Sequence, residues 1–278
     1  MSVSYEEEWR ARFGDAGGLA PDLPDVPWLR QVMTRRTHRR YAERPVAKSL
    51  LHLLLATAFS ASSKSDFQQA SVICVEDRRS RDRLAALIPD MPWIGVAPVF
   101  LVFCGDARRL ELIGELRGHP QDNGKLEGFF NAAVDAALVL QSFTLAAETA
   151  GLGCCPISVI RNHAAAVAEI LGLPDKVFPV AGLCVGYPAV VGHISMRLPL
   201  DVTVHGDQYD EQGLAQAVDA YDRRREARYS LPREQQRSPE VFGYASFYGW
   251  SEDKARQASH PEGEGFSDFL RARGFTFD

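Results

Sequence analysis

Residues 170–188 read ILGLPDKVFPVAGLCVGYP and join the end of a helix to a buried strand. Gly172 and Pro174 close the helical segment 161–174, because glycine accepts the left-handed backbone that ends a helix and proline cannot extend one. The apolar run over 178–188 then predicts a strand that is buried on both faces.

Outward from this strand, strand-like and helix-like segments alternate. Apolar and β-branched residues predict further buried strands at 70–77 and 98–104. Helical spacing of apolar residues is found at 47–61, 78–88 and 126–151. The last of these is apolar around most of its circumference, which predicts a central helix buried on several sides. The alternation favours an α/β or α+β sheet covered by helices over a sandwich or a bundle.

Composition divides the chain into three parts. Residues 1–28 carry prolines at 21, 24 and 27 and predict an extended leader. Residues 29–210 contain the predicted sheet and its helices. Residues 211–278 form a C-terminal extension with a polar helix at 214–231, and we expect this extension to pack on a partner subunit or over the site.

Charge and motif content exclude several classes of protein. The 278 residues carry a formal net charge of −5, so the net charge indicates neither a nucleic-acid partner nor an anionic membrane surface. The stretch 177–196 has no Asp, Glu, Lys or Arg, but its prolines and glycines argue against a membrane span. The seven histidines lack metal-ligand spacing, and no P-loop, Rossmann, zincin or α/β-hydrolase motif occurs, so no metal site is predicted.

The cysteines and the N-terminal residues indicate a cytoplasmic protein. The five cysteines are odd in number and have no CxxC spacing. We expect the vicinal pair Cys154 and Cys155 to be buried as small hydrophobic residues. The first residues, MSVSYEEEWRARFGD, are acidic and lack the apolar stretch of an export signal.

A basic segment precedes the first predicted helix. Residues 34–46 read TRRTHRRYAERPV, with five arginines in a chain of negative net charge. One interpretation is a solvated basic loop. The other is a phosphate clamp, because the guanidinium groups of Arg36 and Arg39, with the Thr37 hydroxyl between them, suit the charge-assisted bonds that a phosphomonoester accepts.

This segment resembles the opening R-x-S-x-R-x-F motif of the nitroreductase superfamily. The resemblance covers residues 30–210, where 62–75 is similar to the family's serine-rich loop and 134–153 to its long dimer helix. Residues 170–188 are similar to its L-x-L-P-x-x-V-x-P-x-x-G-L-x-x-G-x-P signature. The MRLP sequence at 196–199 falls where the NADPH-type oxygen-insensitive nitroreductase and flavin reductase branch carries K-P-R-L-P. The resemblance implies an α+β nitroreductase-like fold with a central mixed sheet, assembled as an obligate homodimer that binds FMN at its interface.

The resemblance also implies which residues bind the FMN phosphate. Arg36, Thr37 and Arg39 would hold it, Arg197 would reach it from the other end of the chain, and Arg35 would occupy a flanking cofactor-contacting position.

The flavin ring would be held by two other segments. Ser63 and Ser65 would bond the pyrimidine edge or the ribityl chain. Backbone groups of Pro156, Ile157, Ser158 and Val159 would line the flavin near N5 and O4, from a subunit that can differ from the one supplying the arginines.

The implied activity is that of an FMN-dependent NAD(P)H oxidoreductase with no catalytic side chain of its own. NADPH or NADH would deliver hydride to flavin N5 and leave, and a small electron-poor acceptor, such as a nitroaromatic, a quinone or a flavin, would then be reduced on the same face. Two alternatives stay open. One is a flavin-dependent dehydrogenase, dehalogenase or tailoring oxidase that acts on one metabolite, and the other is a flavin-binding module without enzymatic activity.

Three positions depart from the branch pattern. Ser195 replaces the lysine before P-R, which removes one phosphate cation. Residues 156–159 replace the branch's Y-I-G-G loop with a bulkier sequence. Met91 lies near the position where the branch has a glutamine that contacts the cofactor. The neighbouring Trp93 is expected either to cap the pocket or to pack in the core.

Overall fold

The computed structural model describes residues 2–14, 23–121 and 124–277. It divides into two units, which we call the sheet unit (residues 36–192 and 263–278) and the terminal unit (residues 1–35 and 193–262). This division differs from the predicted three-part organisation. The leader groups with most of the C-terminal extension, while the end of that extension belongs to the sheet unit.

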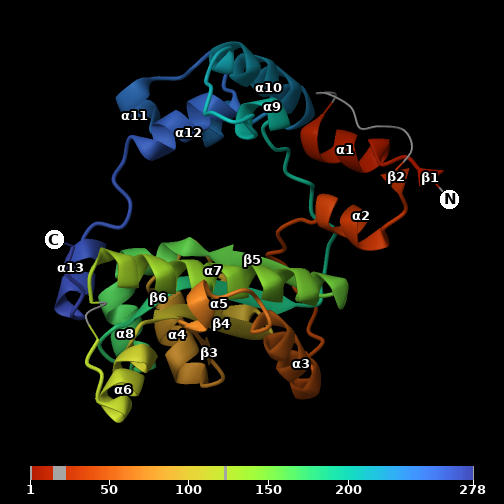
Figure 1. The fold of residues 1–278 in the computed structure, drawn as a ribbon. Helices are drawn as coiled ribbons and strands as arrows, with labels where there is room; N and C mark the ends of the chain where they lie inside the picture. The colour runs from red at the N-terminus through yellow and green to blue at the C-terminus, as the bar shows by residue number, and fades with distance from the viewer. Residues whose placement is uncertain (1, 15–22, 122–123, 278) are drawn as a thin grey trace. The chain divides into compact units, whose positions relative to one another are not determined.

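A four-stranded sheet forms the centre of the sheet unit (Figure 1). Its strands, in spatial order, are β3 (Ala70–Cys74), β4 (Val99–Asp106), β6 (Val177–Gly186) and β5 (Gly153–Ile157). Every strand pair is antiparallel, so the predicted mixed sheet was wrong. Among the described residues, the single parallel pairing is an isolated bridge between Thr37 and Cys154. A strand buried on both faces is apolar throughout, and its sequence therefore does not reveal the direction of its neighbours.

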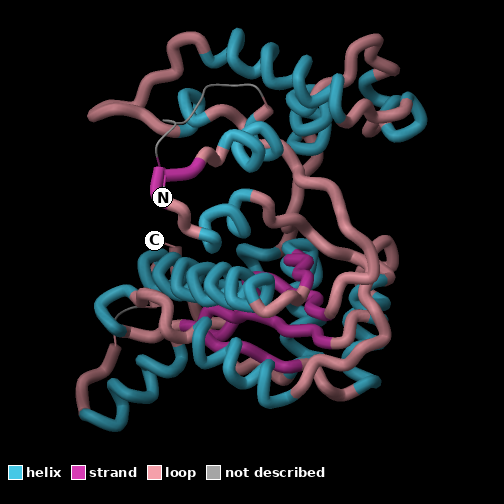
Figure 2. Tube along the Cα trace, turned by 90° about the vertical axis from the view of Figure 1, so that its right-hand side faces the viewer, coloured by secondary structure: helices cyan, strands magenta, loops and turns pink. Residues whose placement is uncertain are grey.

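Helices cover both faces of this sheet (Figures 1 and 2). Leu101 and Phe103 of β4 pack in the core beneath α3 (Lys48–Ala58) and α7 (Leu126–Thr149). Phe100 belongs to the core on the opposite face, because successive strand residues alternate between faces. That second core also receives residues of four other helices: α4 (Arg78–Ala86), α5 (Trp93–Val96), α8 (Ala164–Leu171) and α13 (Phe266–Ala272). The sheet unit also contains α6 (Arg108–Arg117) and the 3-10 turns η1 (Lys64–Asp66) and η2 (Ser158–His163).

The long helix α7 has one buried face and one exposed apolar face. Val139 and Phe143 lie in the core with the sheet. On another side of the helix, an apolar row at four-residue spacing is 39–58% exposed, and we call it the α7 row: Leu126, Phe130, Val134 and Leu138. By length and apolar composition α7 would also suffice to cross a membrane, but the buried face identifies it as a core helix of this fold.

The leader is helical in the structure, so its prediction as an extended segment was wrong for the described residues. It contains α1 (Glu6–Phe13) and α2 (Pro27–Met33), and the short strands β1 (Ser2–Val3) and β2 (Leu23–Pro24) pair antiparallel. Acidic residues in the first turn of α1 and basic residues in its last turn complement the helix dipole. Pro27 occupies the first position of α2, where proline is favourable, while Pro21 lies outside the described residues.

The rest of the terminal unit is helical. Its elements are α9 (Leu200–Thr203), α10 (Leu214–Arg228), η3 (Arg233–Gln235), α11 (Pro239–Phe242) and α12 (Trp250–Ala258). Tyr221 of α10 is 1% exposed, packs edge-to-face with the Trp250 ring and donates a hydrogen bond to the Met196 carbonyl. The predicted polar helix at 214–231 is therefore confirmed, and it has a small core of its own.

Candidate functional site

The arginine-rich segment is fixed to one end of the sheet by backbone pairing. Thr37 pairs with Cys154 of β5, and the His38 N–H donates to the Cys154 carbonyl at 3.0 Å. The Tyr41 hydroxyl donates to the carbonyls of His38 and Cys184, at 2.6 and 3.2 Å. Burial raises the pKa of Tyr41, so this hydroxyl remains a proton donor. The segment is thus held beside β5 and β6 with its side chains on a rigid support.

Two predicted phosphate-binding side chains extend from this segment to different neighbours. Arg36 donates from Nη1 to the Gly192 carbonyl at 3.0 Å. The exposed Arg39 places its guanidinium carbon 5.5 Å from the centre of the Trp93 ring. Trp93 itself is half-buried and packs against the core of the α4 and α8 face, which favours the core interpretation of this residue. Arg36, Thr37 and Arg39 therefore share one segment, with Thr37 anchored between two cations.

The predicted flavin-lining residues 156–159 span the end of β5 and the start of η2. Pro156 and Ser158 are exposed, whereas Ile157 between them is 1% exposed and packs in the core. Pro156 is two residues beyond Cys154, and Cys154 pairs with Thr37, so these residues lie close to the arginine-rich segment. The structure thus brings residues 36–38 and residues 156–159 to the same corner of the sheet.

The vicinal cysteines beside this loop are core residues. Cys154 and Cys155 are 0% and 2% exposed, as the sequence predicted. Burial raises the pKa of Cys155, and the nearby Arg39 and Trp93 only partly oppose this. The thiol is therefore protonated at neutral pH and is a poor nucleophile.

The serine-rich loop is organised by a buried carboxylate. Asp135 of α7 is 2% exposed and accepts hydrogen bonds from the Ser63 hydroxyl at 2.7 Å and from the N–H groups of Lys64 and Gln69, both at 3.0 Å. The Ser63 oxygen also accepts the Gln68 N–H at 2.7 Å. The Ser63 proton is thus committed to Asp135, and a bond from Ser63 to a flavin would have to use the remaining lone pair.

The same loop stores backbone strain. Ser65, Asp66 and Gln68 have φ angles of +50°, +59° and +54°, a region that non-glycine residues rarely adopt. Strain of this kind persists only where the surroundings enforce it, and it is concentrated at functional sites. Ser65 is also exposed, which leaves its hydroxyl accessible to a ligand.

The structure does not bring the serine-rich loop to the arginine-rich segment within one chain. The loop enters β3, at one edge of the sheet, whereas Thr37 and residues 156–159 lie at the β5 edge. Through the strand register, Ala70 aligns with Phe178 of β6 and Cys154 aligns with Val185. Strand spacing and rise then separate Thr37 from Ala70 by about 28 Å.

Arg35 and Arg197 belong to the terminal unit. The Arg35 carbonyl accepts a hydrogen bond from Arg12, and the Arg197 N–H donates to the Arg12 carbonyl at 2.8 Å. The exposed guanidinium of Arg197 donates to the carbonyls of Ser195 and Met196, both at 3.3 Å, and makes no ion pair with any described residue. It is therefore available to a bound anion.

Sequence reasoning missed two residues that organise these segments, Asp135 and Arg12. Asp135 had a detectable signal, because it is a lone carboxylate in the apolar middle of the predicted helix 126–151, and such a charge needs buried donors. Arg12 gave no detectable signal in the sequence, because the residues that it contacts are distant from it along the chain. No cluster of three potential metal ligands occurs among the residues described.

Comparison with known proteins identifies two matching family models. Residues 32–187 match the model of the nitroreductase family, and residues 195–278 match the model of the nitroreductase family's C-terminal domain. The chain is 35% identical over 198 residues to an FMN reductase [NAD(P)H] of Bacillus subtilis, covering 70% of this chain and 79% of that protein. It is also 35% identical over 193 residues to an oxygen-insensitive NADPH nitroreductase of Salmonella typhimurium, covering 68% and 78% of the two chains.

Solved structures of similar fold agree with these matches. The structure of B. megaterium NfrA2 has a TM-score of 0.80 and 30% identity, and the alignment covers 91% of this chain and all of that one. The NADPH:FMN oxidoreductase from Vibrio harveyi complexed with NAD+ has a TM-score of 0.78 and 28% identity, covering 90% of this chain and 99% of that one.

Proposed function

Because this chain belongs to the nitroreductase family, we propose that it is an FMN-dependent oxidoreductase that uses NADPH or NADH to reduce electron-poor acceptors. The relatives named FMN reductase and NADPH nitroreductase support flavins and nitroaromatics as acceptors, and quinones have the same electron-poor character. Neither a dehalogenase nor a tailoring oxidase has support among the relatives named above. Five free cysteines support a reducing compartment, the cytoplasm.

The observation that carries the proposal is the corner where Thr37 pairs with Cys154. There a segment with two arginines and a threonine lies beside residues 156–159, of which Pro156 and Ser158 are exposed. Guanidinium and hydroxyl donors suit the dianionic phosphate of FMN, and exposed backbone suits the polar edge of its ring. The residues present therefore fit this cofactor.

The proposed contacts follow from this placement. Arg36, Thr37 and Arg39 hold the phosphate, Arg197 adds a further cation, and Arg35 contributes a flanking contact. Residues Pro156, Ile157, Ser158 and Val159 offer backbone groups to the ring, and the buried Ile157 side chain keeps that backbone in place.

A second copy of the chain completes the proposed site. Ala70, where the serine-rich loop joins β3, lies about 28 Å from Thr37 by strand geometry, farther than one FMN molecule extends. The α7 row offers an apolar surface for a partner, since exposed apolar rows on a core helix mark interaction surfaces. In the proposed homodimer, one subunit supplies the arginines and its partner supplies the serine-rich loop.

The chain's own residues bind and orient, and none acts as nucleophile or proton donor. When bound, FMN supplies the redox chemistry, accepting hydride at N5 from the nicotinamide and passing it to the acceptor. The arginines fix the phosphate end, and loop 156–159 determines how much of the flavin face is open to the two substrates. Ser158 and Val159 stand where the branch has two glycines, so this loop is the proposed source of acceptor selectivity.

The direct test combines cofactor content with steady-state kinetics. The purified protein is expected to be yellow, dimeric by sedimentation and loaded with FMN. Assays that pair NADPH or NADH with a nitroaromatic and with a quinone should give parallel double-reciprocal lines, because donor and acceptor use the same face in turn. A colourless monomer that ignores added FMN would contradict the proposal. Intersecting lines would favour a specialised enzyme that forms a ternary complex.

A further inference from the structure

The leader helix α1 places a buried arginine between two segments that the proposed function uses. Arg12 is 6% exposed, and its Nη1 donates to the Ser195 carbonyl at 2.6 Å. Its Nε donates to the Met33 carbonyl at 2.9 Å and its Nη2 to the Arg35 carbonyl at 2.5 Å. The leader lies outside both family-model matches, which begin at residues 32 and 195.

These carbonyls belong to segments that are distant in sequence. One segment ends at Arg35 and continues directly into Arg36 and Thr37, while the other runs from Ser195 to Arg197. The Arg12 carbonyl accepts the Arg197 N–H at 2.8 Å, so both the backbone and the side chain of Arg12 bind the second segment. A single leader residue therefore connects, within the terminal unit, the segment that ends at Arg35 and the segment that carries Arg197.

The guanidinium group is suited to this task. Its N–H donors lie in one plane in a fixed fork, so three carbonyls that bind it take up fixed relative positions. Burial of a guanidinium group costs free energy unless its N–H donors are hydrogen-bonded. Movement of either segment away from Arg12 would leave such donors unpaired, so both segments stay bound to it. A lysine in its place would present one ammonium group and could not reproduce the fork.

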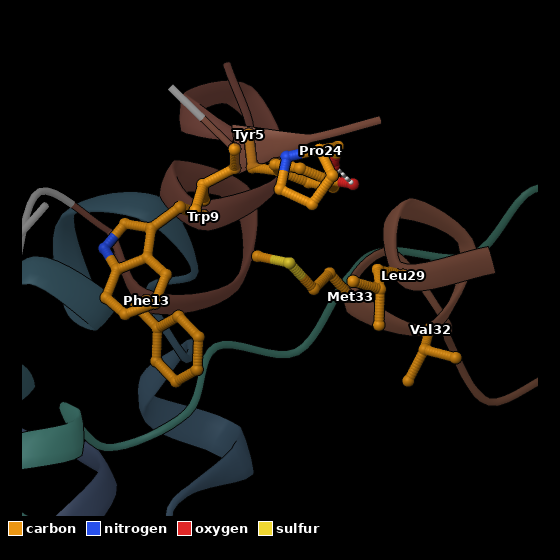
Figure 3. A pocket seen from close by; sticks show the side chains of 8 residues that line it. Tyr5, Trp9, Phe13, Pro24, Leu29, Val32 and Met33 are labelled. Carbon is orange, nitrogen blue, oxygen red and sulfur yellow. Dashed lines mark hydrogen bonds between the residues drawn. The ribbon is translucent and has the colours of Figure 1, made fainter. Parts of the chain in front are cut away.

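Both apolar and polar contacts join α1 and α2. Figure 3 shows Trp9 and Phe13 of α1 facing Met33 of α2 across an apolar pocket of about 440 Å³. Arg30 of α2 bridges the same two helices through an ion pair with Glu8 at 2.6 Å. The pocket leaves part of the apolar contact between the helices open, and the Arg12 hydrogen bonds lie beside it.

We propose that Arg12 is a positioning residue for the cofactor phosphate, because it holds Arg35 and Arg197 in fixed positions relative to each other within the terminal unit. This inference rests on the proposed function, since it takes FMN as the ligand. Ser195 stands where the nitroreductase and flavin reductase branch has a lysine, and the Ser195 carbonyl accepts a hydrogen bond from Arg12. By fixing the backbone of this segment, the leader helps to hold Arg197 at the phosphate, where the branch has an additional lysine charge.

The test compares two flavins on the full-length chain. Riboflavin lacks the phosphate, so the ratio of its dissociation constant to that of FMN measures the phosphate contribution. In Arg12→Ala this ratio should fall at least tenfold, with riboflavin affinity changed less than threefold. Arg12→Lys should recover only part of the loss. Arg10→Ala, on the exposed side of the same helix, should leave the ratio within twofold of the wild type.

A double variant checks the route of the effect. If Arg12 acts by placing Arg197, then Arg12→Ala should reduce the ratio much less in an Arg197→Ala background than in the wild type. Equal losses for both flavins would assign Arg12 a purely structural role and overturn the inference. An unchanged ratio in a folded Arg12→Ala protein would also overturn it. If Arg12→Ala fails to fold, Arg12→Lys is the deciding variant. Its ratio of riboflavin to FMN dissociation constants should fall at least threefold, and an unchanged ratio would contradict the inference.

The wild type separates this inference from the proposed function. If the wild-type chain binds neither flavin, or does not prefer FMN to riboflavin, the phosphate assignment itself fails and this inference fails with it. If the wild type prefers FMN and the ratio is the same in the Arg12 variants, only the role of Arg12 is contradicted.

Discussion

Ser63 donates a 2.7 Å hydrogen bond to Asp135, a carboxylate that is 2% exposed on the central helix α7. The loop that begins at Ser63 contains three non-glycine residues with positive φ angles, a conformation that costs about 1–3 kcal/mol each in typical proteins. Asp135 offsets this cost because one carboxylate binds the hydroxyl and two backbone N–H groups of the loop. The serine-rich loop is therefore preformed before any ligand arrives.

Removal of the Asp135 carboxylate should destabilise the protein. Asp135→Ala leaves two N–H groups and a hydroxyl without their acceptor, and we expect a loss of about 3 kcal/mol in the free energy of unfolding. Asp135→Asn retains one acceptor oxygen and should lose less. Ser63→Ala should cost about 1 kcal/mol. Urea unfolding of the single variants and the double variant should show a coupling of about 1 kcal/mol, whereas simple additivity would contradict a shared network.

A charge in the α7 row should dissociate the proposed dimer. Phe130 is 58% exposed in the single chain, and Phe130→Asp would bury an unpaired carboxylate at the interface. The dissociation constant of the dimer should rise at least about 100-fold, which corresponds to about 3 kcal/mol. Sedimentation should show monomers that have also lost FMN, because a monomer lacks the serine-rich loop that the partner subunit contributes to the proposed site. Leu116→Asp on α6, at a position that is 75% exposed, is the matched control and should remain dimeric.

Loss of the Arg197 guanidinium should weaken FMN specifically. A hydrogen bond to a charged group is worth about 1.5–3 kcal/mol, so Arg197→Ala should reduce FMN affinity about 10- to 150-fold. Riboflavin affinity should not change, since riboflavin has no phosphate. Ser195→Lys should strengthen FMN binding, and the gain should shrink as salt rises, because Ser195 and Arg197 are both exposed. Titration of the apoprotein with both flavins measures each effect, and an equal weakening of the two would remove Arg197 from the phosphate site.

Stability at low pH should depend on Asp253 in the terminal unit. Burial alone would raise the pKa of this carboxyl, but hydrogen bonds and charges from Lys254, Arg237 and Tyr248 outweigh burial and hold the pKa below its usual value. The unfolded chain then binds the proton more readily than the folded one, so the contribution of Asp253 is present at neutral pH and is lost as the pH falls below about 4.

The variant Asp253→Asn tests this dependence. Its destabilisation relative to the wild type should be largest near pH 7 and should shrink as the pH falls through the acidic range in urea unfolding. Asp268→Asn is the control, because this carboxylate is 83% exposed in its pair with Arg271 and should change stability little at any pH. A destabilisation by Asp253→Asn that is constant with pH would show that hydrogen-bond geometry, and not the charge, is what matters.

Local sequence patterns were sufficient for the elements that bury a periodic apolar face. The segments 47–61 and 126–151 became α3 and α7, and 178–188 became β6, because apolar spacing specifies both the conformation and the face that leaves water. The strand β5 was missed, because its five residues follow Gly151 and include Pro156, so they read as the end of a helix. The arginine-rich segment was singled out by residue type, since guanidinium groups suit a phosphate, whereas Ser63 and Ser65 were indicated by the family resemblance alone.

Tertiary structure alone decided which of these donors meet. Thr37 lies beside loop 156–159 because it pairs with Cys154, a contact between distant residues that no local periodicity encodes. Strand order placed Ser63 at the opposite edge of the sheet and committed its proton to Asp135. Arg12 reads as one more charge on a polar helix until the chain folds and three carbonyls enclose it. Residue type thus specifies the chemistry that a side chain offers, whereas strand pairing and burial determine what that side chain contacts.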